Sequence, residues 1–147
     1  MKLHQLSLFL ENRPGALKTP CRLLADAGIN ILTLNIADTA EFGILRLIVK
    51  DWQRARKVLT DAGCVVNVAE VIAIDVPDRP GGLADVLDVL DAENLGIAYV
   101  YAFVHGRKDE HAAMIFRFDE PDRAVQVLAR HRIHAIAATD LFARLNA

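Results

Sequence analysis

Apolar residues follow the periods of strands and helices in alternation along the first half of this chain. Segments with the pattern of a strand lie at residues 6–10, 29–37, 42–49 and 64–68. Between the first two, Leu17, Cys21 and Leu24 share one face at helical spacing. A second helix is predicted across residues 51–62, between the third and fourth strands. The predicted order of elements in residues 1–68 is therefore βαββαβ.

The second half of the chain repeats this pattern almost without a linker. Its strand segments lie at residues 71–76, 95–104, 112–118 and 134–142. Helical faces begin near Leu83 and Pro121, and residues 105–111 form a hairpin loop between the middle strands. A βαββαβ unit of this length is typical of the ferredoxin-like sandwich, an antiparallel sheet with two helices on one face. The predicted fold class is α+β, with tandem ferredoxin-like domains at residues 1–68 and 69–147.

The same short turn follows the first strand of each half. It reads NRPGAL at residues 12–17 and DRPGGL at residues 78–83. Proline and glycine turn the chain sharply, and the first amides of the helix that follows have no internal partner and lie at the positive end of its dipole. A small carboxylate suits such a position. The alternative is a turn that serves only the fold. Pro20 also predicts an irregular start for the first helix.

The repeated motif resembles a known family. An apolar strand, then [ND]-R-P-G-x-L, then a helix ending in AGINI is similar to the ACT domain, the amino-acid-sensing module of biosynthetic enzymes. The resemblance covers essentially the whole chain, once per half, and extends to free-standing tandem ACT proteins that carry no catalytic domain. It implies two antiparallel ferredoxin-like ACT domains paired side by side, and a free amino acid as effector.

The resemblance also implies which residues bind the effector. In the serine-sensing ACT domain of phosphoglycerate dehydrogenase, two asparagines from adjoining domains hold the ligand, and Asn12 in ENRPG and Asn30 in GINI match them. Leu10 stands where that family has a histidine, so serine is not implied. The expected amino-acid-binding residues are Asn12, Arg13, Pro14, Gly15, Ala16, Leu17, Asn30, Ile31, Asp78, Arg79, Pro80, Gly81, Gly82, Leu83, Gly96 and Ile97.

Two ways of pairing the domains would join these residues differently. If the two halves pair side by side, Asn12 meets Gly96 and Asp78 meets Asn30. If the first halves of two chains pair instead, Asn12 meets Asn30. The glycines of both turns allow a ligand to approach the main chain closely. The side-chain oxygen of Asn12 or Asp78 would then accept a hydrogen bond from the ammonium group.

The second strand of the second half carries an aromatic stripe. Matching it to the first half places Ala98, Val100 and Ala102 toward the helices and Tyr99, Tyr101 and Phe103 on the open face of the sheet. An apolar stripe on an open face is expected to pack against something. A second domain or a second chain is one interpretation, and the side chain of a bound amino acid is the other. We expect a homodimer.

Composition and charge exclude several classes of protein. A net charge of −2 and the absence of RNP-type aromatics argue against nucleic-acid binding, including by the RNA-recognition domain of the same topology. No apolar run is long enough to span a membrane. The N-terminal segment has no signal-peptide pattern, and Cys21 and Cys64 are isolated. These features predict a protein of the reducing cytoplasm.

Catalytic and metal-binding patterns are weak. Ser7, the single serine, lies within a predicted strand, and the two cysteines occupy apolar positions. His105 and His111 flank the long hairpin without a clear third ligand. We therefore expect no enzyme activity, cofactor or metal, and a sensor that modulates a partner enzyme of amino-acid metabolism. A scaffold that binds no ligand and a small ferredoxin-like enzyme are the alternatives.

Overall fold

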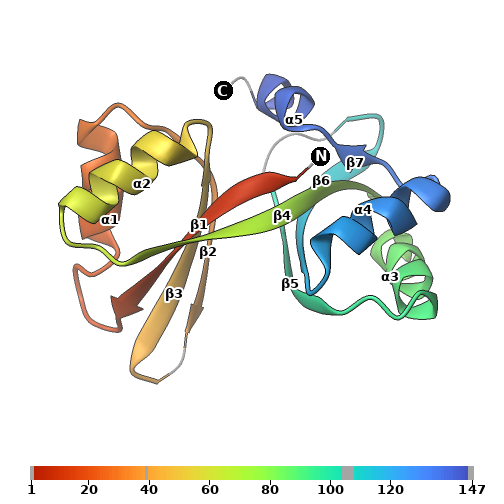
Figure 1. The fold of residues 1–147 in the computed structure, drawn as a ribbon, viewed down its shortest axis with the longest axis horizontal. Coiled ribbons are helices and arrows are strands. Elements are labelled where there is room, and N and C mark those ends of the chain that lie inside the picture. Colours follow the sequence, from red (N-terminus) through yellow and green to blue (C-terminus); the bar gives the residue numbers. More distant parts are fainter. Residues whose placement is uncertain (1, 39, 104–107, 146–147) are drawn as a thin grey trace. The chain divides into compact units, whose positions relative to one another are not determined.

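The structure is a computed structural model that describes residues 2–38, 40–103 and 108–145 (Figure 1). Its elements are β1 (Leu3–Glu11), α1 (Lys18–Asp26), β2 (Ile31–Asp38), β3 (Phe42–Val49), α2 (Trp52–Asp61), β4 (Val66–Pro77), α3 (Gly82–Ala92), β5 (Ile97–Ala102), β6 (His111–Phe118), α4 (Pro121–Arg130), β7 (Ala135–Ile136) and α5 (Ala138–Arg144). Two compact units divide the described chain. The N-terminal unit comprises residues 4–69, and the C-terminal unit comprises residues 70–145 with residues 2–3.

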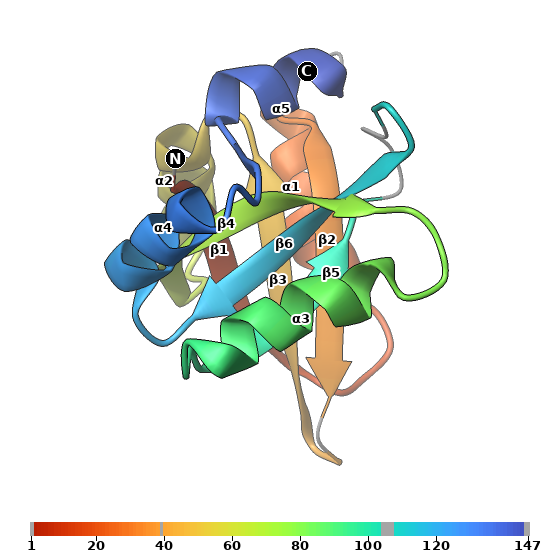
Figure 2. The same cartoon turned by 90° about the vertical axis from the view of Figure 1, so that its right-hand side faces the viewer.

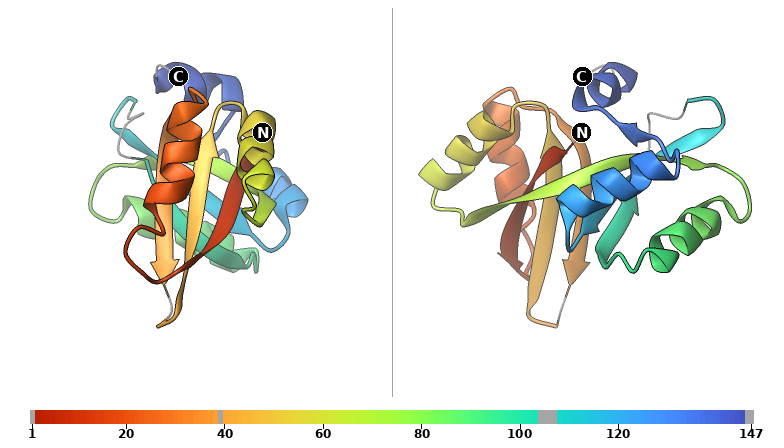
Figure 3. Two further views of the ribbon diagram at one scale, coloured as in Figure 1. Left: turned by 90° about the vertical axis from the view of Figure 1, so that its left-hand side faces the viewer. Right: turned by 45° about the vertical axis from the view of Figure 1, so that its right-hand side comes forward.

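The N-terminal unit is a sheet covered on one face by two helices. Strands β1 and β2 both pair antiparallel with β3, and paired residues such as Leu8 and Leu45 share a face. Helices α1 and α2 lie on the same face of this sheet (Figures 1 and 3). The fully buried side chains between sheet and helices are Leu6, Leu8, Leu24, Leu45, Leu47, Ala55 and Leu59. The predicted βαββαβ order is confirmed for this part of the chain, with β4 as its last strand.

The C-terminal unit repeats that design. Strand β6 pairs antiparallel with β4 and β5, and helices α3 and α4 cover one face of the sheet (Figure 2). The buried core between them includes Ile72, Ile74, Leu90, Phe116, Phe118 and Leu128. The rings of Phe116 and Phe118 stack with their centroids 5.7 Å apart. Both units therefore have the ferredoxin-like fold that the sequence predicts.

The strands expected at residues 64–68 and 71–76 form one strand, β4, of 12 residues. No glycine, proline or polar cluster interrupts residues 66–76, so the chain has no local reason to leave the extended conformation. Its Val66–Ala69 segment belongs to the N-terminal unit, and the rest belongs to the C-terminal unit. The boundary predicted between these two strands is therefore wrong, because the backbone stays extended across it.

The prediction of a strand at residues 134–142 is mostly wrong. Only Ala135 and Ile136 pair with β4, and the chain then forms helix α5. Asp140 lies in the first turn of α5 and Arg144 in the last, an arrangement that complements the helix dipole. The side chain of Leu141, a residue of α5, is fully buried. A short apolar stretch is compatible with the periodicity of a strand and with that of a helix, and here tertiary packing favours the helix.

The register of β5 tests the predicted faces of this strand. Val100 pairs with Phe116 and Ala102 with Met114, on the face toward the helices, which confirms their predicted side. Tyr99 and Tyr101 lie on the other face as expected, with ring centroids 6.4 Å apart. The pairing is irregular between Ile97 and Tyr99, and Ala98, which lies within this irregularity, is exposed.

Pro20 occupies the third position of α1 and is buried. The chain first forms a turn over residues 14–17, so the helix begins only at Lys18. The first four amides of a helix have no intrahelical acceptor, and a proline there therefore breaks no helical hydrogen bond. The irregular start that this proline predicts is confirmed.

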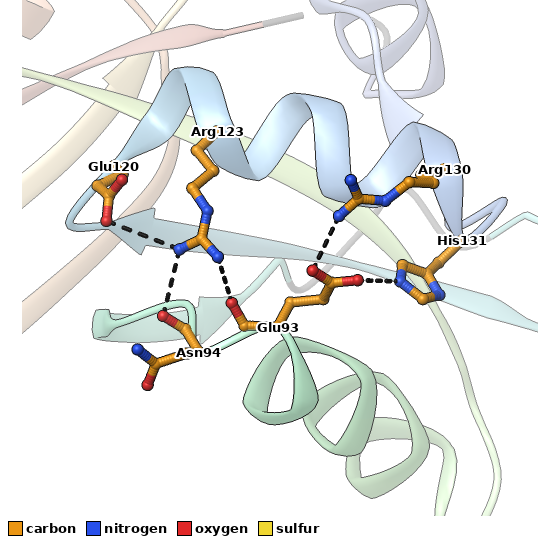
Figure 4. A network of polar contacts seen from close by, with 6 residues as sticks. All are labelled: Glu93, Asn94, Glu120, Arg123, Arg130 and His131. Atoms are coloured by element: carbon orange, nitrogen blue, oxygen red, sulfur yellow. Dashed lines mark hydrogen bonds and ion pairs between the residues drawn. The ribbon is translucent and has the colours of Figure 1, made fainter.

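A polar network joins the end of α3 to α4 (Figure 4). The Arg123 guanidinium donates to the backbone carbonyls of Glu93 and Asn94, which lie just beyond the last turn of α3. The Glu93 carboxylate accepts from Arg130 at 2.8 Å and bonds to His131 Nε2 at 2.7 Å. The bond to His131, followed by the nearby charge of Arg130, lowers the pKa of Glu93 below its usual range.

The lowered pKa of Glu93 predicts a contribution to stability that depends on pH. The unfolded chain protonates this carboxyl near its ordinary value of 4.5, whereas the folded chain keeps it ionised to lower pH. The network therefore contributes fully above about pH 4.5 and is lost as the pH falls through the lower folded value. Glu93→Gln is expected to lower Tm at about pH 6 and to approach wild type as the pH falls increasingly far below about 4.5 in circular dichroism melts.

Asp88→Asn is the matched control for this prediction. Asp88 is exposed on α3, the helix that Glu93 follows, and has no ion pair among the residues that the structure describes. The difference in Tm between this variant and wild type is expected to stay small across this pH range. If the Tm of Asp88→Asn differs from wild type with the same pH dependence as the Tm of Glu93→Gln, the effect of Glu93→Gln does not come from the polar network.

Candidate functional site

The first repeated turn is open. Strand β1 ends at Glu11, residues 12–17 form the turn, and α1 begins at Lys18. Gly15 has φ +85°, in the left-handed region where a side chain costs energy. Apart from Gly15 itself and its two chain neighbours, no heavy atom of the described residues lies within 4 Å of the place that a Cβ on Gly15 would take. The glycine is therefore required by the backbone, and the space beside it is free.

Two amides of this turn have no acceptor within the described part of the chain. Asn12 N donates to Glu41 O, and Ala16 N donates to Arg13 O at 3.2 Å. The amides of Gly15 and Leu17 make no such bond to the backbone of the described residues. Leu17 is the N-cap of α1 and supplies no side-chain cap. The beginning of α1 therefore presents unpaired donors where the helix dipole favours an anion.

A hollow of about 120 Å³ lies beside this turn. It is lined by Leu10, Glu11, Asn12, Arg13, Ala16, Leu17, Ile36, Asp38 and Gly43. Arg13 Nε lies 2.8 Å from the Glu11 carboxylate, and Asn12 Nδ2 donates to Ala40 O at 3.4 Å. Among the residues that the structure describes, no donor is paired with the Oδ1 atom of Asn12. The hollow thus combines donors, acceptors and an apolar wall.

Asp38 was not among the residues selected from the sequence. It ends β2, and its partner across the ladder is Gly43. The signal for it lay in the alternation of this strand, because Leu34, Ile36 and Asp38 follow one another on one face. A carboxylate in an otherwise apolar row, opposite a glycine, is unusual enough to be noticed. The structure brings it to the same hollow as Asn12.

Asn30 lines a different hollow of the same unit. This hollow, of about 420 Å³, is lined by Gly28, Ile29, Asn30, Leu32, Lys50, Asp51 and Arg54. Asn12 precedes α1 and Asn30 follows it, and nine helical residues extend over about 14 Å. Ile31 pairs with Val49 and packs against the core. One N-terminal unit therefore does not bring the two asparagines together.

The second repeated turn is covered. Helix α3 begins at Gly82, directly after Gly81, whose φ is also +85°. The Arg79 guanidinium lies 2.7 Å from the Asp85 carboxylate in the first turn of α3, and 3.6 Å from where a Cβ on Gly81 would stand. This ion pair places the protein's own charges over the beginning of the helix. Pro80 is exposed beside it.

The remaining predicted residues of the second unit have structural roles. A Cβ on Gly82 would stand 1.9 Å from the carbonyl oxygen of Pro77, so glycine lets α3 approach β4 closely. Leu83 packs against the core. A Cβ on Gly96 would stand 2.0 Å from Asp119 Oδ2, and Ile97 packs against the core. Asp78 N donates to Glu110 O at 2.8 Å, which ties this turn to the opposite hairpin.

Other candidate chemistry is sparse in the described residues. Cys21 and Cys64 are free and half-buried. His105 lies outside the described residues, and His111 Nδ1 is 2.7 Å from Asp109 O. Residues 2–38, 40–103 and 108–145 contain no group of three or more side chains placed to hold a metal ion. None of the helices described is long and apolar enough to cross a membrane.

The family model named ACT domain pair matches residues 1–145. The chain belongs to the ACT domain pair family. The crystal structure of protein BT0572 from Bacteroides thetaiotaomicron is 40% identical over 97% of this chain and 96% of that one, with a TM-score of 0.88. This likeness extends the assignment over both units. A search of curated proteins found no match.

More distant structures share the fold of this ACT domain pair. The ligand-free regulatory subunit of aspartate kinase from Thermus thermophilus is 14% identical, covers 86% of this chain and 91% of its own, and has a TM-score of 0.62. The regulatory subunit of aspartate kinase from Thermus flavus is 15% identical, with coverages of 86% and 88% and a TM-score of 0.60.

The surroundings of the glycines in this ACT domain pair predict how strongly each glycine-to-alanine variant lowers the free energy of unfolding. Gly82→Ala is expected to lower the free energy of unfolding by at least about 2 kcal/mol, because the backbone of Pro77 blocks the new methyl group. Gly15→Ala is expected to cost about 1 kcal/mol, from the left-handed backbone alone. Urea denaturation of both variants measures the difference.

Gly96→Ala serves as the control for these two variants. Its new methyl group would meet the carboxylate of Asp119, the far end of an exposed side chain that can rotate away. Gly96→Ala is therefore expected to cost less than Gly82→Ala. If Gly15→Ala is the most destabilising of the three, the space beside the first turn is not free.

Proposed function

We propose that this ACT domain pair is a regulatory protein that binds a free amino acid at its first turn. The observation that carries the proposal is the beginning of α1, where the amides of Gly15 and Leu17 face no backbone acceptor within the described chain. Leu17 and Ala16, the residue that follows Gly15, line the hollow beside this turn. The bound amino acid would change the activity of a partner enzyme of amino-acid metabolism, and the chain itself would perform no catalysis.

The lining of the hollow matches both charged groups of an amino acid. The carboxylate would accept hydrogen bonds from the amides of Gly15 and Leu17, assisted by the helix dipole. The ammonium group would donate to Asn12 Oδ1 and to the carboxylate of Asp38. Leu10 and Ile36 would contact the carbon atoms of the ligand. A zwitterion satisfies these groups better than a simple anion, which would leave Asp38 without a counter-charge.

Asn30 enters the proposal through a second copy of the chain. In the serine-sensing ACT domains that this chain resembles, the two asparagines come from adjoining domains. Asn12 and Asn30 of one N-terminal unit line different hollows. We therefore infer a homodimer in which the N-terminal units of two chains adjoin, so that Asn30 of one chain completes the hollow of the other. Such a site would couple ligand binding to the arrangement of the chains.

The second turn is not proposed as an equal site. Arg79 and Asp85 already occupy the beginning of α3, and an amino acid would have to displace their ion pair. Gly82, Leu83 and Gly96 are accounted for by packing. The two halves thus keep the same turn, and only the first offers it to a ligand. A cytoplasmic location is part of the proposal, supported by the two isolated thiols.

A scaffold that binds no ligand is the second candidate. The observation that favours it is the exposure of Leu34 (44%) and Ile36 (41%) on the helix-facing side of β2. Apolar side chains left exposed side by side are suited to a permanent protein interface. In that case the hollow beside the first turn would be filled by the partner, and no amino acid would bind.

A thermal-shift screen of the full chain against the twenty amino acids tests the proposal. An amino acid at about a hundredfold excess over its Kd adds about 2.7 kcal/mol of stability. For a chain of 147 residues this is expected to raise Tm by about 5–10 °C. Asn12→Ala and Asn30→Ala are expected to abolish the shift.

Asp78→Ala is the matched control, because it changes the equivalent position of the second turn. It is expected to retain the full shift. The proposal fails if none of the twenty amino acids stabilises the wild type, which would favour the scaffold. It also fails in its choice of turn if Asp78→Ala loses the response while Asn12→Ala keeps it.

A further inference from the structure

The C-terminal unit contains a hollow of about 420 Å³ that includes none of the residues of the repeated turn. Pro77, Val86 and Ile133 give it an apolar wall. Three cationic side chains also line it: Lys108, Arg132 and Arg144. Its volume is within the range of sites for small molecules. Neither the resemblance to ACT domains nor the proposed function uses this part of the unit.

Helix α5 closes one side of the hollow through an ion pair. Arg144 donates both Nη atoms to the Asp75 carboxylate, at 2.6 and 3.0 Å, and each side chain is only 12% exposed. His134 Nε2 lies 3.6 Å from the same carboxylate. Asp75 is therefore already neutralised by the protein itself. Since α5 is an addition to the βαββαβ unit, this wall is a particular feature of the second half.

The remaining charges of the hollow favour an anion. With Asp75 and Arg144 paired, the fully ionised side chains left in the lining are Lys108, Arg132 and Asp109. The sum of their formal charges is positive. Lys108 and Arg132 are both exposed, so a ligand can reach them from solvent. The hollow thus offers a cationic rim above an apolar wall.

The backbone at Arg132 shows that this guanidinium is held at some cost. Each of the helices α1 to α4 ends with the same hydrogen bond, from Ile29 N to Leu24 O, Cys64 N to Leu59 O, Leu95 N to Leu90 O and Ile133 N to Leu128 O. In each case the residue before the donor has positive φ: Gly28 (71°), Gly63 (90°), Asn94 (53°) and Arg132 (56°).

Glycine and asparagine are the residues that tolerate this left-handed position, and arginine is not. The chain itself uses glycine twice and asparagine once at the equivalent place. Among these four helix ends, Arg132 is the exception to that rule. The two residues that follow it, Ile133 and His134, line the hollow. An unfavourable backbone conformation that places a charged side chain at a cavity points to a function for that side chain.

We propose that this hollow binds a small organic anion that carries a carboxylate or phosphate group. Arg132 and Lys108 contact the anionic group, and Pro77, Val86 and Ile133 contact the carbon skeleton. Guanidinium groups bind either anion through paired hydrogen bonds. The ACT domain pair then carries two chemically different effector sites, one for a zwitterion in the N-terminal unit and one for an anion in the C-terminal unit.

Arg132→Gly separates a binding role from a structural one. Glycine relieves the left-handed backbone, so the variant is expected to melt at a higher temperature than wild type. Loss of the guanidinium is expected to weaken anion binding about tenfold or more, because hydrogen bonds between charged groups are lost. Calorimetric titrations of the full chain with inorganic phosphate and with succinate measure affinity, and identify which anion is preferred.

Asn94→Gly is the matched control, since it makes the same backbone change after α3 without touching the hollow. It is expected to bind both probes as wild type does. Arg132→Asn tests the charge again with a residue that tolerates the left-handed backbone, and is expected to bind as weakly as Arg132→Gly. The proposal is overturned if wild type binds neither phosphate nor succinate, or if Arg132→Gly binds them as tightly as wild type.

Backbone NMR shifts place the ligand and keep this proposal distinct from the proposed function. Addition of the preferred anion is expected to move the amides of Ile133 and His134 and to leave those of residues 12–17 unchanged. Shifts confined to residues 12–17 would overturn the assignment to this hollow. An amino acid that moves residues 12–17 in the same protein supports the first site independently, whatever the anion does.

Discussion

Both units depend on a left-handed glycine that turns the chain from its first strand into its first helix. At Gly15 and Gly81 the backbone has the same φ of +85°, which a residue with a side chain adopts only at a cost. This conformation reverses the chain so that the helix returns over the sheet and covers its apolar face. In the first unit, the amides of Gly15 and Leu17 make no hydrogen bond to the backbone of the described residues. The turn is therefore required for folding, and its ability to bind an anion follows from the same backbone.

The two halves have used this shared geometry differently. In the first, α1 starts three residues after Gly15, no side chain caps it, and a hollow lies beside its free amides. In the second, α3 starts directly at Gly82, and the ion pair of Arg79 with Asp85 lies at the beginning of the helix. In the described residues, helix α5 has no counterpart in the first half, and Arg144 of this helix lines the hollow of the second half. Divergence between the copies is thus concentrated at helix ends, where a few side chains change the chemistry without disturbing the core.

Local pattern was sufficient for most of the fold. The alternation of Leu34 and Ile36, the helical spacing of Leu17, Cys21 and Leu24, and the glycines after each turn predicted the elements of the first half. The pattern failed at residues 134–142, where a short apolar run fits a strand or a helix equally, and burial of Leu141 decided. It also missed the irregular pairing at Ala98, because an irregularity in strand pairing depends on the partner strand and has no signature in the strand itself.

The sequence by itself determined the duplicated architecture, the family and the two turns, since these depend on periodicity and on residues such as Gly15 whose backbone requirement is local. Only the tertiary structure decided that the first turn is open and the second covered, that Asn12 and Asn30 line separate hollows, and that Asp38 joins Asn12. It also revealed the hollow between α5 and Arg132. The reason is physical: a cavity and an ion pair arise from residues far apart in the chain, and their meeting depends on packing that no local pattern encodes.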